Sequence, residues 1–243
     1  MRGLEDPQAG LSRRGAASRR RRGISLIELI VILAVVGLFS LISVPFLGRS
    51  LRDSGVKASA RAVADLLQLA RSEAIRTSHR HVVFFGPAGT SDPAGRLLVD
   101  ADGASVPILA LNDGSSASSN CRIDPGEPVQ TSRARGGVTF GVTHATSRAP
   151  GDAGSGTFEP PQASGSTFAD PTLRPVNWVV FRNDGIPVIF TGAQGGCGKT
   201  GPIGSGGAAV YLTNGSRDYA IVLAPLGGVR VHHWISGASS WSS

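Results

Sequence analysis

The chain has 243 residues, of which 41% are hydrophobic and 17% charged, and this composition excludes a disordered or low-complexity protein. Its 33 glycines and 15 prolines exclude an all-helical protein and favour strands joined by many turns. The net charge of +7 is concentrated in residues 1–23, which hold seven arginines and two acidic residues and leave +2 for the rest. The basic balance therefore belongs to this leader and is a weak argument for nucleic-acid binding.

A long uncharged segment follows the basic leader. The 19 residues Leu29–Leu47 carry no charge, and as a helix they extend about 28 Å, which matches a bilayer core of about 30 Å. Because the arginines precede this segment, the positive-inside rule keeps residues 1–23 cytoplasmic and sends the C-terminal bulk outward. The sequence therefore predicts a single membrane-spanning helix in this segment, with the C-terminal bulk outside the cytoplasm.

One carboxylate, Glu28, lies near the start of this apolar segment. Placing a carboxylate at the hydrocarbon centre costs up to about 2.5–3.5 kcal/mol. An acidic residue in this segment is therefore expected to have a functional role by default. The alternative is a solvated carboxylate at the interface. A cleaved secretory signal and a plain anchor are competing interpretations of the segment, but neither gives Glu28 a role. The small residues at positions 58–60 resemble a signal cleavage site, yet they lie well beyond the apolar run.

The segment Gly23-Ile-Ser-Leu-Ile-Glu28, after a basic run and before a long apolar helix, resembles the processing site of type IV prepilins and type II secretion pseudopilins. The resemblance implies that a prepilin peptidase cuts between Gly23 and Ile24 and that the new terminus at Ile24 is N-methylated. It also implies a single-pass inner-membrane protein with a periplasmic C-terminal domain, in which residues 24–47 form the transmembrane and assembly half of a helix. Ile24 departs from the Phe or Met that is usual there. Glu28 is then the fifth mature residue, where the family keeps a glutamate. Gly37 and Pro45 also stand where many pilins have a glycine and a proline, and together they should weaken or kink the helix.

Filament assembly gives this pattern a physical reason. Cleavage creates an α-ammonium group on Ile24, and Glu28 of one subunit can pair with that group on its neighbour. Removing one partner of such a buried pair costs about 3–5 kcal/mol, so the pair selects the axial register of stacked helices. The expected partners are the prepilin peptidase, other pseudopilins or pilins through the N-terminal helix, the inner membrane, and a secretion or pilus assembly platform.

The helix is expected to run from about Ile24 to about Thr77. Along residues 48–78, small and apolar residues recur at spacings of four and three, which predicts an amphipathic half that packs one face on a sheet. The residues of this face are Val56, Ala60, Val63, Leu67, Ala70 and Ala74.

Residues 79–243 have the pattern of an antiparallel β domain. Two hairpin signals, Asn183-Asp-Gly185 and Asn214-Gly215, separate short apolar segments. Residues 112–136 and 143–175 are rich in Gly, Ser, Pro and Ala and are interpreted as inserted surface loops. The predicted fold class is α+β, a pilin-like fold in which a long N-terminal membrane-spanning helix packs on a small antiparallel β-sandwich or sheet domain with long loops. The candidate strands are residues 81–85, 96–99, 106–111, 138–142, 177–181, 187–190, 208–212, 219–223 and 229–234.

Three further segments resemble the GspH/FimT-type minor pseudopilins: residues 70–76 at the helix end, 181–188 as a hairpin and 219–231 as closing strands. The resemblance implies a minor pseudopilin of the type II secretion system, processed by prepilin peptidase and assembled into a periplasmic pseudopilus for protein secretion. The alternative is a minor pilin of a type IV pilus involved in pilus assembly or DNA uptake, in which Arg217 and Arg230 contact the phosphates of a nucleic-acid partner. A secreted enzyme is a third class. The sequence has no Ser/His/Asp arrangement or paired carboxylates in a plausible site, so no enzyme activity, catalytic residue or cofactor is expected.

Cys121 and Cys197 form no CxxC motif, and no His or carboxylate partner is apparent at ligand spacing, so no metal site is expected. Outside the cytoplasm the two cysteines either form a disulfide or remain free thiols. Residues 193–200 match a relaxed phosphate-binding loop. The glycine-rich segment that follows cannot form the helix that a phosphate site of this kind needs, so nucleotide binding is not expected.

The histidines do not indicate a metal site. His232 and His233 are adjacent in a candidate strand, so their side chains point to opposite faces and cannot share one ion. His79 and His81 are expected to lie on the surface.

Overall fold

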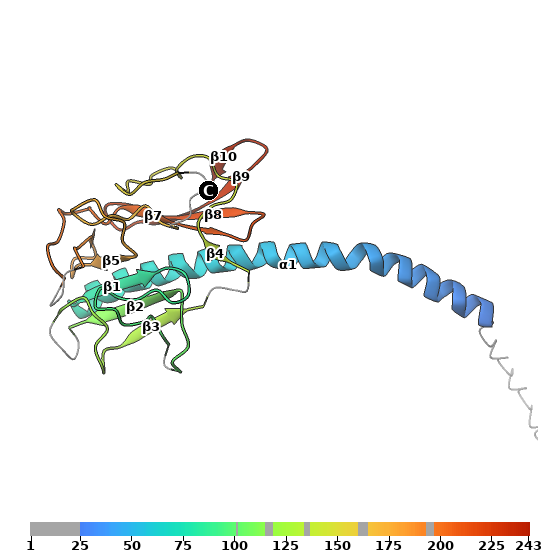
Figure 1. Ribbon diagram of the computed structural model, residues 1–243, viewed down its shortest axis with the longest axis horizontal. Coiled ribbons are helices and arrows are strands. Elements are labelled where there is room, and N and C mark those ends of the chain that lie inside the picture. Colours follow the sequence, from blue (N-terminus) through green and yellow to red (C-terminus); the bar gives the residue numbers. More distant parts are fainter. Residues whose placement is uncertain (1–24, 101, 115–118, 134–136, 160–164, 193–196) are drawn as a thin grey trace, which may run out of the picture. The chain divides into compact units, whose positions relative to one another are not determined.

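The computed structural model describes residues 25–243 except 101, 115–118, 134–136, 160–164 and 193–196 (Figure 1), and of residues 41–47 and 49–51 it describes the backbone alone. The chain falls into two compact units, Met1–Phe46 and Leu47–Ser243, which are considered separately below. The predicted cleavage site at Gly23 and Ile24 lies outside the described residues.

The helix α1 spans Leu26–Thr77 and contains both Gly37 and Pro45. In the second unit its small and apolar residues at spacings of four and three are buried, with Val56 fully buried and Leu67 1% exposed. The helix ends where Ser78 adopts a positive φ of 57°, a conformation that cannot continue a right-handed helix. The Thr77 hydroxyl donates to the Glu73 carbonyl oxygen at 2.7 Å and so satisfies one of the last carbonyls.

The described strands of the second unit form two five-stranded antiparallel sheets. The first sheet has the order β3-β2-β1-β5-β6, and the second has the order β10-β9-β8-β7-β4. The strands of the first sheet are β1 (Arg80–Phe85), β2 (Ile108–Asp113), β3 (Val129–Ser132), β5 (Trp178–Phe181) and β6 (Pro187–Val188). Those of the second are β4 (Thr139–Phe140), β7 (Ala208–Thr213), β8 (Asp218–Leu223), β9 (Val229–Ile235) and β10 (Ser240–Ser242).

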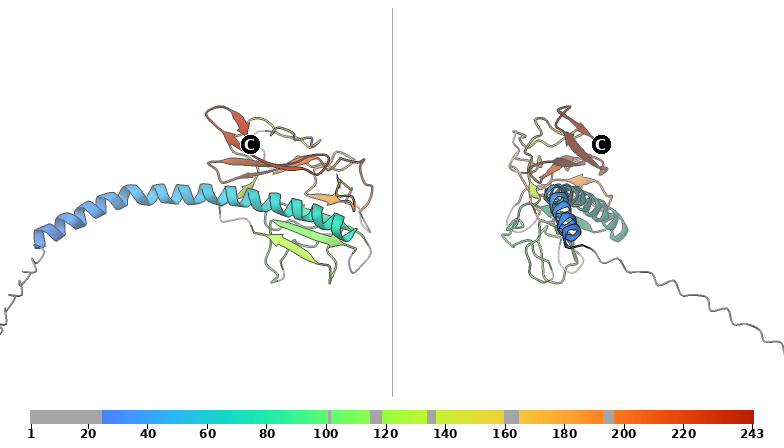
Figure 2. Two further views of the ribbon diagram at one scale, coloured as in Figure 1. Left: turned by 180° about the vertical axis from the view of Figure 1, so that it is seen from behind. Right: turned by 90° about the vertical axis from the view of Figure 1, so that its right-hand side faces the viewer.

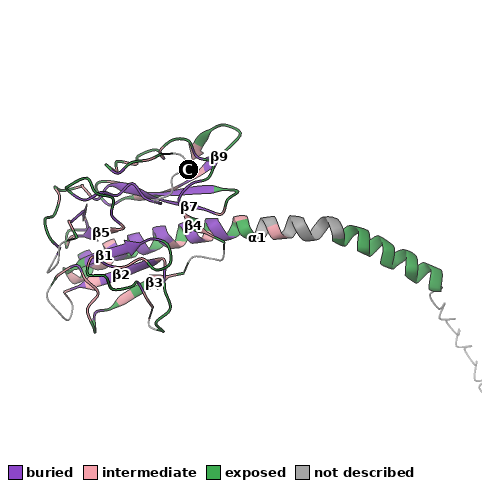
Figure 3. Cartoon of the chain, viewed as in Figure 1, coloured by how far each residue is buried: buried purple, intermediate pink, exposed green. Residues whose placement is uncertain are grey.

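The part of α1 in the second unit lies between the two sheets (Figures 2 and 3). One core cluster joins Leu67 of the helix to Phe85 and Ile108 of the first sheet and to Val210 and Ile221 of the second. Because side chains alternate along a strand, each sheet gives one apolar face to this central core and turns another outward. The central layer of the domain is therefore a helix and not a direct sheet-on-sheet contact.

The outer faces of both sheets are also apolar, and loops cover them. Cys121 and Cys197 lie in the cluster on the outer face of the first sheet, and Ala149 lies in the cluster on that of the second. The prediction that residues 112–136 and 143–175 form surface loops is therefore wrong in part. The first segment includes β3 and the buried Cys121, and the second supplies Ala149, which is 3% exposed. Their composition of small residues suits close packing against a sheet.

A buried carboxylate fixes the start of the second covering segment. Asp218 is 1% exposed, and it accepts the backbone N–H groups of Thr143, His144 and Ala145 at 2.6–3.1 Å. These charge-assisted hydrogen bonds replace the water that a carboxylate would otherwise need. The segment is thus tied to the first residue of β8.

The predicted fold class and location are wrong. The second unit is built on two five-stranded sheets with a helix between them, and not on a small sheet domain beside a helix. Among the residues that the structure describes, no helix combines the length and the apolarity needed to cross a membrane. This finding contradicts the predicted single-pass inner-membrane location.

Among the described residues of the second unit, five chain reversals repeat one geometry. In each, the N–H of the fourth residue donates to the carbonyl of the first, and the N–H of the first donates to the carbonyl of the fifth. The first residues of these turns are Asp92, Asp100, Asp170, Arg182 and Ala224. The fourth residue always has a positive φ, and it is glycine in four turns and Leu173 in the fifth, with φ 64°. This is a type I turn followed by a left-handed residue, which favours glycine.

Candidate functional site

The candidate assembly site of the first unit is the beginning of α1. Glu28 lies in the first turn of the helix and is exposed. The neighbouring apolar side chains are exposed as well, from 77% for Leu26 to 46% for Val35. A helix that is apolar on all sides is stable only when other apolar groups cover it. Glu28 therefore lies at the end of a helix whose apolar side chains have no packing partners within the described chain.

Two expected features of this helix stay predictions. Gly37 has open space around it, since a Cβ placed there would meet nothing within 4 Å. Pro45 is part of α1, but its side chain lies outside the described groups. The kink expected from these two residues is thus neither supported nor refuted.

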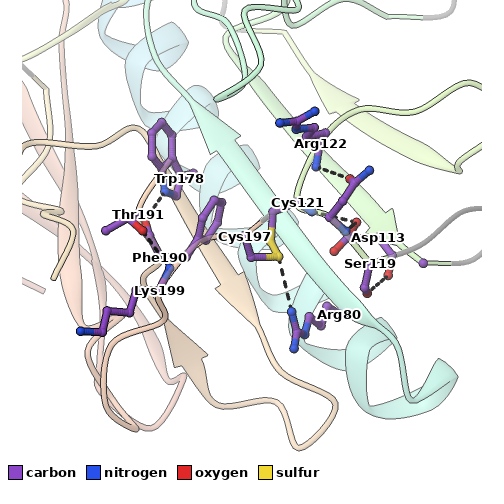
Figure 4. The surroundings of a disulfide bond; sticks show 12 residues. Arg80, Asp113, Ser119, Cys121, Arg122, Trp178, Phe190, Thr191, Cys197 and Lys199 are labelled. Atoms are coloured by element: carbon purple, nitrogen blue, oxygen red, sulfur yellow. Dashed lines mark hydrogen bonds between the residues drawn. A yellow bond between two sulfur atoms is a disulfide. The ribbon is translucent and has the colours of Figure 1, made fainter. Parts of the chain in front are cut away.

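A second candidate site surrounds the two cysteines, on the outer face of the first sheet (Figure 4). Of the two alternatives that the sequence leaves open, the structure has the disulfide, which joins Cys121 and Cys197 across 76 residues. Cys121 is fully buried and has a positive φ of 56°. The Arg80 guanidinium approaches the sulfur of Cys197, with Nη1 at 3.4 Å from Sγ.

Asp113 at the end of β2 also lies beside this disulfide. Its carboxylate oxygen and the two sulfur atoms all lie within 4.8 Å of one another. The side chain of Asp113 is fully buried, and burial raises the pKa of its carboxyl group. The sequence shows no carboxylate at ligand spacing from the cysteines, yet the fold places Asp113 beside them. Asp113 precedes Cys121 by eight residues, a spacing outside the usual ligand motifs, and only the strand-to-loop reversal brings the two together.

A third candidate is a basic groove between α1 and the second sheet, with a cavity of about 380 Å³. Its lining includes Lys57 and Arg61 from α1, and Arg217, Tyr219 and His233 from the segments around β8 and β9. The Arg217 Nε is 2.7 Å from a carboxylate oxygen of Asp53. This is the one ion pair that the described residues of the groove make, and it leaves an excess of positive charge. Burial raises the pKa of Tyr219, whose hydroxyl remains neutral.

The two arginines proposed for phosphate contact do not lie together. Tyr219 and Val231 pack toward α1, and by alternation Arg217 shares their side of the sheet. Arg230 is the partner of Val222, whose side chain belongs to the cluster on the outer face. Arg217 and Arg230 are thus on opposite faces of the second sheet.

The segment whose sequence matches a phosphate-binding loop is not followed by the helix that such a loop requires. Residues 193–196 lie outside the described part, but Thr191 and Lys199 exchange hydrogen bonds at 2.8 and 3.0 Å, and Phe190 bridges to Thr200. Lys199 is therefore paired with Thr191, and residues 201–207 contain turns in place of a helix.

The histidines are placed as follows. His79 is exposed, but His81 is buried in β1 at 5% exposure, so the expectation of two surface histidines is wrong for His81. Burial lowers the pKa of His81 and also that of His232.

No family model, curated protein or solved structure matches the chain.

Proposed function

We propose that the chain is a minor pseudopilin subunit of a type II secretion system, which a prepilin peptidase processes between Gly23 and Ile24 and which assembles into a pseudopilus through its N-terminal helix. One observation carries the proposal: Glu28 stands in the first turn of a helix whose apolar side chains are exposed from Leu26 to Phe39. Such a helix requires apolar neighbours, and like helices of other subunits supply them.

The acidic residue gives this association a defined register. After cleavage, the α-ammonium group of Ile24 on one subunit pairs with Glu28 on the next. Inside an apolar bundle, an unpaired carboxylate is costly, so that a shift of one helix along another is penalised by about 3–5 kcal/mol. The second unit, with its helix held between two sheets, is then the head that each subunit presents along the filament.

The test is replacement of Glu28 by Gln in cells that lack the native chain. E28Q keeps the size and polarity of the side chain but removes its charge, so we expect the processed subunit to accumulate without entering filaments and secretion of substrate proteins to fall at least tenfold. D65N is the matched control, because Asp65 is an exposed acid on the same helix within the second unit. Wild-type assembly and secretion by E28Q would refute the proposed role.

The alternative, a minor pilin of a type IV pilus involved in assembly or DNA uptake, is favoured by the basic groove. Lys57 and Arg61 of α1 and Arg217 of the β domain line it together. Phosphate groups of DNA displace counterions from such a surface, so that affinity falls steeply with salt. Binding of labelled duplex DNA, lost in K57A/R61A and weakened by salt, would favour the pilus. Absence of salt-dependent binding would leave the secretion subunit as the better account.

A further inference from the structure

We infer that the thiol form of this chain binds one zinc ion through Cys121, Cys197 and Asp113. This site is separate from the helix on which the proposed function depends. In the disulfide form the two sulfur atoms are bonded to each other and cannot act as ligands. The same pair of cysteines thus serves two mutually exclusive states, the covalent crosslink that Figure 4 shows and a metal site.

The ligand atoms are close enough for one ion. The sulfur atoms and a carboxylate oxygen of Asp113 all lie within 4.8 Å of one another. Zinc binds thiolate sulfur at about 2.3 Å and carboxylate oxygen at about 2.0–2.2 Å, which places ligand atoms roughly 3.5 Å apart in a tetrahedron. The Cα atoms of the two cysteines are 4.9 Å apart, so side-chain rotation after reduction separates the sulfur atoms. Three protein ligands leave a fourth position for water.

The state of Asp113 independently points to a ligand. Its Oδ1 accepts the N–H groups of Asn120 at 2.9 Å and Cys121 at 3.0 Å. Its Oδ2 is buried and has no hydrogen-bond partner of acceptable geometry among the described residues, because the nearby Ser119 hydroxyl donates to the Asp113 backbone carbonyl at 3.2 Å instead. A buried carboxylate oxygen without a partner is destabilising, and natural structures seldom keep one without a use. A zinc ion would supply the missing partner.

The charges of the site balance when zinc is present. Two thiolates and one carboxylate carry three negative charges, which is too many for a buried site by itself. Zinc offsets two of them, and the Arg80 guanidinium, with Nη1 at 3.4 Å from the Cys197 sulfur, offsets the third. The nearby carboxylate of Glu127 accepts the N–H groups of Gly114 and Asp124, so its oxygens are already engaged.

Conversion of the disulfide form to the zinc-bound form balances in electrons and protons. A dithiol reductant transfers two electrons and two protons to the disulfide, which becomes two thiols, and the reductant is released as its own cyclic disulfide. Zinc then displaces one proton from each thiol and coordinates the carboxylate of Asp113 directly. Oxidation by a disulfide compound reverses the sequence and releases the ion. A chain that has not yet formed its crosslink would be held folded by zinc in its place.

The test uses the full chain, reduced with dithiothreitol and freed of reductant without oxygen, with Co²⁺ as the spectroscopic probe for zinc. We expect one Co²⁺ per chain with thiolate charge-transfer absorbance, displacement by Zn²⁺, and no such signal from the disulfide form. D113N keeps an oxygen for the Asn120 and Cys121 N–H groups and removes only the unpartnered one. We expect it to bind at least about tenfold more weakly, since even residues that merely support a ligand change metal affinity by 10–100-fold.

D170N is the matched control, because the Oδ1 of Asp170 accepts N–H groups within a turn in a similar way but lies outside the ligand set. It should bind like the wild type, and circular dichroism of each oxidised variant verifies its fold. Equal affinity of D113N and wild type would overturn the inference, because the thiols alone would then account for binding. The inference would also be overturned if the reduced chain bound no ion, or if the reduced chain unfolded in the presence of zinc.

Discussion

The turn at Ala224–Gly228 allows a stability prediction of defined size. Its fourth residue, Gly227, has φ 85°, and a Cβ there would lie 2.8 Å from the backbone oxygen of Gly185 and 2.9 Å from Nε of Arg71. Arg71 also donates from Nη1 to the Gly227 carbonyl at 3.0 Å, so this turn fastens α1 to the second sheet. Gly103 occupies the same place in another turn, with φ 79°, and a Cβ there would meet nothing within 4 Å.

The two glycines separate conformational strain from steric conflict. A left-handed conformation costs a non-glycine residue about 1–2 kcal/mol, and the lower chain entropy of alanine returns about 0.5–1 kcal/mol, so G103A should lose about 1 kcal/mol. G227A bears the same strain and must also displace the Gly185 backbone or Arg71. Overpacking of this kind costs about 1–3 kcal/mol more. We therefore expect G227A to lose about 2–4 kcal/mol.

Urea unfolding of both variants, followed by tryptophan fluorescence, measures the difference. The three tryptophans all lie in the β domain and report its unfolding. Leu173 occupies the equivalent position of another turn with φ 64°, so strain alone is compatible with the fold. Equal losses in G103A and G227A would refute the reasoning, because they would mean that Arg71 and Gly185 do not restrict this turn.

Three further outcomes follow from the buried groups. Replacement of both cysteines by serine removes a crosslink across 76 residues, and the entropy of the opened loop corresponds to about 4.5 kcal/mol of lost stability in urea unfolding. L67A, at a position 1% exposed between the sheets, should cost about 2–5 kcal/mol, whereas a loss below about 1 kcal/mol would argue against a helix in the central layer. Burial lowers the pKa of His81 from its usual 6.5, so the unfolded chain binds a proton at this residue more readily than the folded chain. The stability that neutral His81 contributes is therefore complete above pH 6.5 and is lost as the pH falls through the folded-state pKa. H81Q should flatten that loss between about pH 7 and pH 5, and an unchanged pH profile would count against a buried His81.

Local patterns were enough to locate much of the second unit. The spacing of apolar residues from Val56 to Ala74 indicates which face of α1 is buried, because 3.6-residue periodicity is a property of the helix itself. The signals at Asn183 and Asn214 likewise mark real hairpins, β5–β6 and β7–β8. Both follow from residues close in sequence, for which conformational preference and structure are directly linked.

The layering was not predictable in this way. Which of the two sheets a strand joins depends on contacts between residues far apart, such as the pairing of β1 with β5. Two short strands, β3 and β10, have too few apolar residues to stand out from loops. The burial of the segments at 112–136 and 143–175 also depends on the apolar outer faces that they cover. A composition rich in small polar residues is equally typical of an exposed loop and of a segment that packs closely on a sheet.

The candidate sites also differ in whether they depend on local sequence or on contacts between distant residues. Glu28 could be singled out because a carboxylate before a long apolar run is anomalous in the sequence itself. Asp113 could not, since nothing in its neighbourhood marks it, and its proximity to Cys197 results from a crosslink between distant segments. The basic groove joins Lys57 and Arg217, which are equally remote in the chain.

The most direct test of the central claim is the mass and N-terminal sequence of the protein purified from cells that contain a prepilin peptidase. The account predicts a chain that begins at Ile24 and carries one methyl group on its α-amino nitrogen, and it predicts that the intact precursor accumulates when the peptidase is absent. A chain that begins at Met1 in the presence of the peptidase would contradict the account, because Ile24 would then carry no ammonium group for Glu28 to pair with. A terminus beyond the first turn of α1 would contradict it as well, because Glu28 itself would be missing.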